Sequence, residues 1–162
     1  MKSMDINRIK EFRQFKNEIR GSDRFLIAGL DIGKSMHYAF LGTANGKTVK
    51  RGMRVENSAS GFEHLLTMVQ FYMDRDGFKD IVFGLEPTSV YHKPLAEFLI
   101  THDHLVVYLT NEAIKKNRSL LDGRWDKNDT KDSDSSSAWR TMLFVANTFR
   151  PITHAFHSSM LR

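Results

Sequence analysis

The sequence predicts an α/β fold with a mixed five-stranded sheet and flanking helices. Short apolar runs at residues 25–30 and 80–85 are typical of strands buried on both faces. Between two further strand-like segments, Asn45-Gly46 predicts a tight hairpin turn, because both residues tolerate positive φ. From Ser60 onward, helical patterns alternate with strands, which indicates parallel crossovers.

The first element expected is a basic amphipathic helix over residues 1–21. Apolar residues recur at roughly helical spacing, basic residues lie between them, and Gly21 ends the pattern. The apolar positions are Ile6, Ile9, Phe12, Phe15 and Ile19. Two interpretations stay open: the helix packs on the domain, or it contacts nucleic acid or a partner.

Three strands are expected next, joined in sequence by turns. The first, residues 25–30, ends in Asp31-Ile-Gly-Lys34, and residues 36–42 and 47–55 form the hairpin. Ser60 is expected to cap the following helix. The apolar face of that helix carries Phe62, Leu65, Leu66, Val69 and Tyr72.

The second half of the chain alternates strands and helices. A buried strand at residues 80–85 ends in Glu86-Pro-Thr88, a helix covers 91–101 and a fifth strand covers 105–109. Residues 111–125 are polar and basic, and the segment Asp129-Thr-Lys-Asp132 opens a last helix. This order of elements matches the ribonuclease-H-like architecture.

The composition limits the classes of protein to which this chain can belong. With 162 residues the chain suits one compact domain, and a net charge of +5 (24 basic minus 19 acidic residues) suits a polyanionic partner. The absence of cysteine excludes disulfides and zinc–thiolate sites. No apolar run is long enough to span a bilayer, and the charged start does not resemble a signal peptide, so a cytoplasmic location is expected.

Four carboxylates form the candidate site. Asp31 and Glu86 directly follow buried strands, where open α/β sheets place their sites. Asp129 and Asp132, spaced i, i+3, point to one side of a helix. Acids gathered in this way repel each other unless a hard divalent cation such as Mg²⁺ or Mn²⁺ binds them. Four acids from three segments suit two-metal phosphoryl transfer, with the ions about 4 Å apart.

Each acid also has a structural interpretation. Asp31 fits a turn before Gly33, and the Asp129–Asp132 pair fits a helix cap favoured by the helix dipole. The joint placement of the four favours the metal site. A basic group surrounds Trp125 and either holds phosphates or forms a solvated face. With Lys34, the candidate nucleic-acid-binding residues are Lys115, Lys116, Arg118, Arg124, Lys127 and Lys131.

Three motifs in order resemble a known family. Gly29-Leu-Asp-Ile-Gly-Lys34 with His37, Gly84-Leu-Glu-Pro-Thr88 with Tyr91, and the segment 121–132 resemble the DEDD transposases of the IS-one-ten, Piv-like family. The resemblance covers about residues 24–132 and implies a RuvC-like domain over residues 22–132. It places the family's acidic tetrad on Asp31, Glu86, Asp129 and Asp132, and it implies magnesium, DNA strand exchange, a structured guide RNA and homo-oligomers.

The sequence departs from the family in two ways. Ser89 stands where the family has glycine, and residues 133–162 form an atypical tail, for which a frameshift or disorder is one hypothesis. The family's nucleophilic serine belongs to a C-terminal domain, so this chain is expected to be incomplete and inactive alone. Two alternatives stay open: a non-catalytic remnant that binds nucleic acid or a transposase, and an actin- or sugar-kinase-like ATP-binding domain.

Overall fold

The computed structural model describes residues 22–87 and 89–109, with residues 10, 13–14, 17–19 and 150–151. From residue 25 to residue 108 its strands and helices follow one another as the sequence predicts. They are β1 (Phe25–Asp31), β2 (Met36–Gly42), β3 (Thr48–Glu56), α2 (Ala59–Asp76), β4 (Asp80–Leu85), the 3₁₀ turn η1 (Val90–His92), α3 (Lys93–Thr101), β5 (Leu105–Tyr108) and β6 (Arg150–Pro151).

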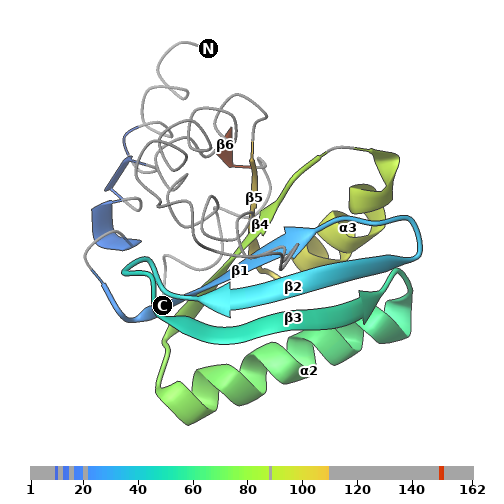
Figure 1. Cartoon of the computed structure of the whole chain (residues 1–162). Helices are drawn as coiled ribbons and strands as arrows, with labels where there is room; N and C mark the ends of the chain where they lie inside the picture. The colour runs from blue at the N-terminus through green and yellow to red at the C-terminus, as the bar shows by residue number, and fades with distance from the viewer. Residues whose placement is uncertain are drawn as a thin grey trace, which may run out of the picture.

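The strands form a sheet with the order β3-β2-β1-β4-β5-β6 (Figure 1). Strands β1, β2 and β3 pair antiparallel, whereas β4 lies parallel to β1, and β5 lies parallel to β4. A meander of three antiparallel strands, extended on one side by two parallel ones, is the ribonuclease-H-like arrangement. The α/β fold with a mixed sheet is therefore confirmed.

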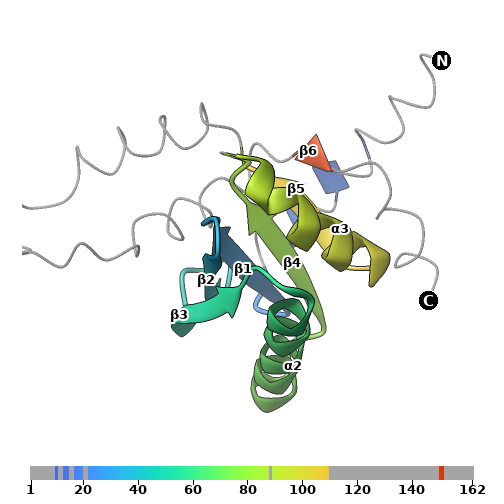
Figure 2. The ribbon, with the colours of Figure 1, turned by 90° about the vertical axis from the view of Figure 1, so that its right-hand side faces the viewer.

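Both helices α2 and α3 pack on one face of this sheet. Figure 2 shows them on the same side, and the rings of Phe62 in α2 and Phe98 in α3 lie 5.5 Å apart. Alternate residues of β1 enter the core beneath them: Leu26, Ala28 and Leu30. The residues between them face the opposite side, where Ile27 is 5% exposed. Both faces of β1 are therefore buried, as its continuous apolar run predicts.

The sheet holds one strand more than predicted. Residues Arg150–Pro151 pair antiparallel with β5, in the tail for which the sequence predicts no element. Proline cannot donate a backbone hydrogen bond, so it is tolerated in an edge strand such as this one. At the other end of the chain, residues 10, 13–14 and 17–19 are helical, as expected. Ile19 is 2% exposed while Lys10 and Arg13 are exposed, which favours a packed helix.

The predicted start of α2 is two residues late. Ser58, and not Ser60, is the N-cap, because its side chain accepts a hydrogen bond from the backbone N–H of Gly61. Gly61 is required by packing, since a Cβ there would collide with the carbonyl oxygen of Glu56. At its other end, Gly77 adopts φ 74° and closes the helix. Within the described residues, no helix is long and apolar enough to cross a membrane.

The capping assignment predicts a difference between two serines. Ser58→Ala removes the acceptor for the Gly61 N–H, and we expect the free energy of unfolding to fall by about 1 kcal/mol. Ser60→Ala, the matched control, places a better helix former at an exposed helical position and should change stability by less than about 0.5 kcal/mol. Urea unfolding of both variants measures the difference, and equal losses would contradict the assignment.

Candidate metal centre at the carboxyl edge of the sheet

The pairing of β1 with β4 brings Asp31 and Glu86 together. These parallel strands pair in register from Phe25 with Asp80 to Leu30 with Leu85. Asp31 ends β1 and Glu86 directly follows β4, so the two acids occupy the next position of the same register. Because neighbouring strands lie about 4.8 Å apart, their carboxylates come from adjacent points on one edge of the sheet. We call Asp31 and Glu86 the acidic pair.

The donor chemistry of the acidic pair fits a hard cation. The Asp31 side chain is exposed and has no hydrogen bond or salt bridge to another described residue. Glu86 is half-buried beside it. Two carboxylates on adjacent strands repel each other, and a divalent ion with oxygen ligands removes that repulsion. The pair therefore fits Mg²⁺ or Mn²⁺, as the sequence predicts.

The turn after Asp31 is held by residues at the start of β2 and in the loop after β3. Gly33 is required, because a Cβ there would collide with the carbonyl oxygen of Met36. The Gly33 N–H donates to Nδ1 of His37 at 3.2 Å. Asn57, just after β3, donates its side-chain amide to the Lys34 carbonyl at 2.9 Å and its backbone N–H to the Ser35 carbonyl at 3.0 Å. These hydrogen bonds fix the backbone that directly follows Asp31.

His37 is the buried centre of this turn. Its side chain is fully buried and stacks on Phe62, with ring centroids 6.2 Å apart. Burial lowers the pKa of His37 below its usual value, and the Asn57 amide and the Asp31 charge offset this only in part. Since Gly33 donates to Nδ1, the neutral ring carries its proton on Nε2, which has no hydrogen-bond partner among the described residues.

The turn after Glu86 leads directly into a helix. The Ser89 side chain accepts the backbone N–H of Tyr91, and the Ser89 carbonyl lies against Nδ1 of His92. The His92 ring in turn meets Tyr108 of β5 edge-on, with centroids 5.2 Å apart. The backbone N–H of Leu109 bonds to the Leu85 carbonyl at 2.8 Å, directly beneath Glu86. Each acid therefore sits on a backbone that neighbouring elements hold in place.

Comparison with known proteins identifies the family. A family model, DEDD_Tnp_IS110, described as a transposase, matches residues 28–135, which is well over half of the chain. The chain belongs to this DEDD transposase family. It is the IS-one-ten family of the sequence resemblance, which is thereby confirmed.

Other comparisons are more distant. No curated protein sequence matches the chain. Among solved structures, T. thermophilus RuvC in complex with a Holliday junction substrate is similar, with 12% identity, a TM-score of 0.46, and coverage of 79% of this chain and 99% of that one. At this score the likeness is weak, so the fold assignment rests on the sheet topology.

Several predicted residues of the transposase site lie outside the described part of the chain. These are Asp129, Asp132 and the basic residues Lys115, Lys116, Arg118, Arg124, Lys127 and Lys131. Lys34 is described, and it is exposed three residues after Asp31. Within residues 22–87 and 89–109 no three metal-ligating side chains cluster. The acidic pair is thus half of the predicted tetrad, and the other half stays a prediction.

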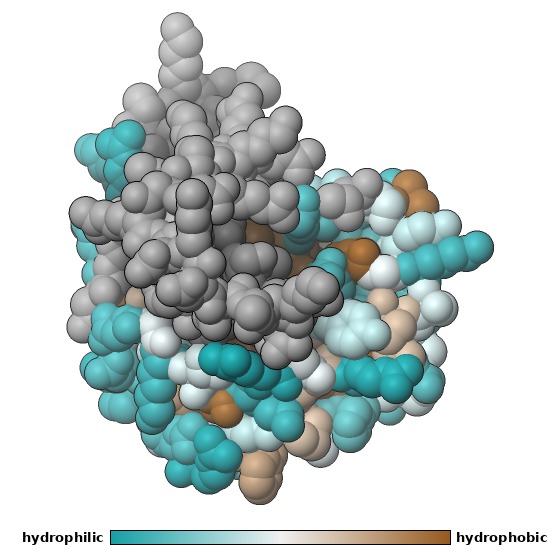
Figure 3. All heavy atoms as spheres, in the orientation of Figure 1, coloured by the Kyte–Doolittle hydropathy of each residue, from teal (hydrophilic) through white to brown (hydrophobic). Residues whose placement is uncertain are grey.

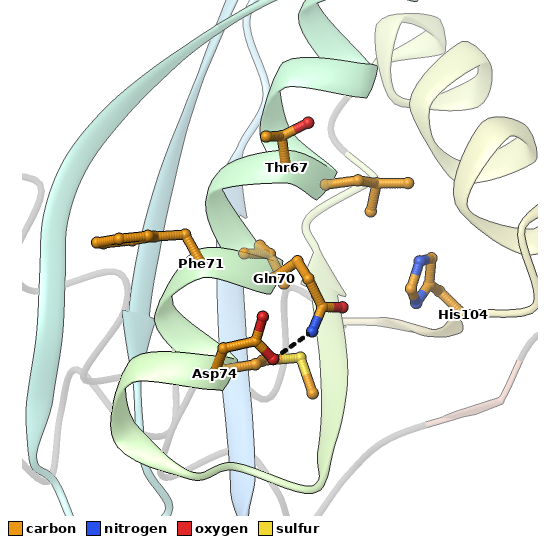
Figure 4. A pocket seen from close by; sticks show the side chains of 8 residues that line it. Thr67, Gln70, Phe71, Asp74 and His104 are labelled. Carbon is orange, nitrogen blue, oxygen red and sulfur yellow. Dashed lines mark hydrogen bonds between the residues drawn. The ribbon is translucent and has the colours of Figure 1, made fainter.

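One groove of the transposase domain is lined by residues of α2 and by His104, and neither Asp31 nor Glu86 lines it (Figure 4). It encloses about 590 Å³ between the second half of α2 and His104, near the amino ends of β4 and β5. Inside it, Gln70 Nε2 donates to Asp74 Oδ1 at 2.8 Å.

The sequence did not predict the supporting roles of His37 and Asn57, since only the fold brings these side chains to the turn after Asp31. A polar residue inside an apolar strand pattern was the available signal for His37.

Two histidines, His37 fully buried and His104 half-buried, predict that stability depends on pH. Burial lowers the pKa of His37 and His104 below 6.5, so below that pH the unfolded chain binds more protons than the folded one. Stability is therefore full above pH 6.5 and is lost as pH falls through the lowered values. His37→Asn keeps an acceptor for Gly33 but cannot titrate, and we expect a flatter dependence in urea unfolding from pH 8 to 5.

His64→Asn on the exposed surface of α2 is the control for this measurement. It should leave the pH dependence of the free energy of unfolding as it is in the unchanged protein. Equal slopes for all three proteins would show that His37 is not a buried neutral group.

Proposed function

We propose that this chain supplies the metal-binding and DNA-binding part of transposition, in which DNA strands are cleaved and exchanged. The observation that carries the proposal is the register of β1 and β4, which sets Asp31 beside Glu86 at the carboxyl edge of the sheet. Membership of the transposase family supports DNA as the substrate class. Exposed Lys34 beside the acids adds a positive charge suited to a phosphate.

The residues that would hold Mg²⁺ or Mn²⁺ are Asp31 and Glu86, together with Asp129 and Asp132. When bound, the ions supply Lewis-acid stabilisation of the oxygens at the reacting phosphate. The chain's own contribution is positioning, which the structure explains in detail. His37 and Asn57 hold the turn beyond Asp31, and Leu109 holds the Leu85 carbonyl beneath Glu86.

Strand exchange requires more than this site. The family resemblance assigns the nucleophilic serine to a separate domain, so we propose that residues 24–132 bind metal and DNA and do not supply the nucleophile. A guide RNA and assembly into oligomers belong to the same proposal. A chain that binds branched DNA with magnesium but does not cleave it fits this division of labour, and it also fits the non-catalytic remnant.

Substitution of the acidic pair tests the proposal. Asp31→Asn and Glu86→Gln keep the shape of each side chain and remove its charge. Because loss of a group that merely orients a metal ligand weakens binding by about 10- to 100-fold, loss of a ligating carboxylate should weaken Mn²⁺ binding by at least about tenfold. Isothermal titration calorimetry measures the affinity, and gel shifts of a branched DNA with and without Mg²⁺ measure its consequence.

Glu63→Gln, at an exposed position of α2, is the matched control and should bind Mn²⁺ as the unchanged chain does. In metal-free buffer, Asp31→Asn should have an equal or higher Tm, because Asp31 is exposed and the substitution removes a negative charge beside Glu86. Undiminished Mn²⁺ affinity in both folded variants would refute the metal centre.

A further inference from the structure

A row of three side chains crosses the sheet at the acidic pair. Tyr38 of β2 lies directly opposite Asp31 of β1 and, on its other side, directly opposite Arg54 of β3. Directly opposed residues on adjacent strands point to the same face of a sheet. At about 4.8 Å per strand, the row from Asp31 to Arg54 spans about 10 Å. We call it the Asp31–Tyr38–Arg54 row.

Tyr38 is more exposed than is usual for an aromatic residue of an interior strand. β2 is an interior strand, and Phe40, two residues along on the same face, is 4% exposed. Tyr38 is nevertheless 41% exposed, immediately beside Asp31. An accessible aromatic ring next to acids that act on a nucleic acid offers a stacking surface for a base, since every base has a flat π-face.

The cations beside Tyr38 complete the surface. Arg54 is exposed, as are Lys50 and Arg51 further along the same edge strand and Lys34 in the loop between β1 and β2. The one salt bridge within the described residues, Arg75–Asp76, involves none of them. Edge strands carry basic residues to prevent aggregation, which accounts for Lys50 and Arg51. Arg54 lies on the same edge strand, and its register with Tyr38 also places its charge one strand away from the aromatic ring.

The surface beyond Arg54 is hollowed. Arg54 borders a depression of about 440 Å³ with Met36, Glu56, Ser60, Gly61 and His64, where the first turns of α2 meet the edge of the sheet. Figure 3 shows mainly hydrophilic residues over β3 and α2 in the lower part of that view. Glu56 is the opposing charge, and it would repel a phosphate at the far side of the depression. A phosphate is therefore best placed at the Arg54 guanidinium itself, between the depression and the Tyr38 ring.

We propose that Tyr38 and Arg54 form a docking surface for a single-stranded segment of DNA next to the acidic pair. One base stacks on the Tyr38 ring, and the adjoining phosphate pairs with the Arg54 guanidinium. The inference rests on the proposed function, since DNA is the strand that the acids act on, and Tyr38 is the neighbour of Asp31. It adds a contact that requires no metal ion.

Binding of a fluorescent single-stranded oligodeoxynucleotide to the full chain in EDTA tests the proposal by anisotropy. Since stacking of one base contributes about 1–3 kcal/mol, Tyr38→Leu should weaken binding by about fivefold or more, and Tyr38→Phe should stay within about twofold. Phe71→Leu, an aromatic residue 56% exposed on α2, is the control and should change nothing. Arg54→Gln should reduce the salt dependence of log K by about 0.7, the value for one phosphate contact on a single strand.

Photocrosslinking of the unchanged chain to a 5-bromodeoxyuridine oligonucleotide provides a readout independent of any variant, and the crosslink should map to Tyr38. A crosslink elsewhere, or full affinity in folded Tyr38→Leu, overturns the docking surface. Tighter Tyr38-dependent binding of the matching RNA overturns the assignment to DNA. These outcomes are separate from the acidic pair, whose substitution acts on metal-dependent binding, whereas the Tyr38 effect is measured in EDTA.

Discussion

The parallel ladder between β1 and β4 is the constraint on which the site depends. Its register runs without a shift from Phe25–Asp80 to Leu30–Leu85, so the next residue of each strand is an acid. A slip of one residue would turn one strand's side chains to the other face and separate the carboxylates. Such a slip is prevented by burial, because Leu30 and Leu85 are both fully buried in the core. The packing of aliphatic side chains thus determines where two charges meet.

The arrangement at this edge of the sheet also affects the stability of the fold. Two acids on neighbouring strands bring like charges together, and Gly33, His37 and Asn57 hold the turn that follows Asp31. The buried His37 itself carries a pKa lowered by desolvation and one ring nitrogen without a partner among the described residues. Both features agree with the proposed metal centre, since sites are often maintained at some expense of stability.

Much of the fold could be predicted from the sequence, because its main signals are local. Continuous apolar runs predict strands buried on both faces, and Asn45-Gly46 predicts the hairpin, in which Gly46 has φ 86°. The start of α2 was misplaced since Ser58 and Ser60 are equally good caps by composition. The hydrogen bonds of Asn57 to the turn after Asp31 depend on how the strands pair, and so does the Asp31–Tyr38–Arg54 row. No single segment of the sequence encodes that pairing. Strand β6, Arg150–Pro151, is too short to show the alternation of apolar and polar residues that predicts a strand.

The order of the strands in the sheet also indicates which strand pairs are expected to form early in folding and which late. β1, β2 and β3 are neighbours along the chain, whereas β4 meets β1 from 55 positions further on (Asp80 minus Phe25). Local hairpins close faster than distant parallel pairs, which must first overcome a larger loop-closure entropy. We therefore expect the β1–β2–β3 meander, with Asp31 at the end of β1, to pair before β4 brings Glu86 beside it. A cation that needs both carboxylates binds only the finished sheet, and so favours completion of folding over every earlier intermediate.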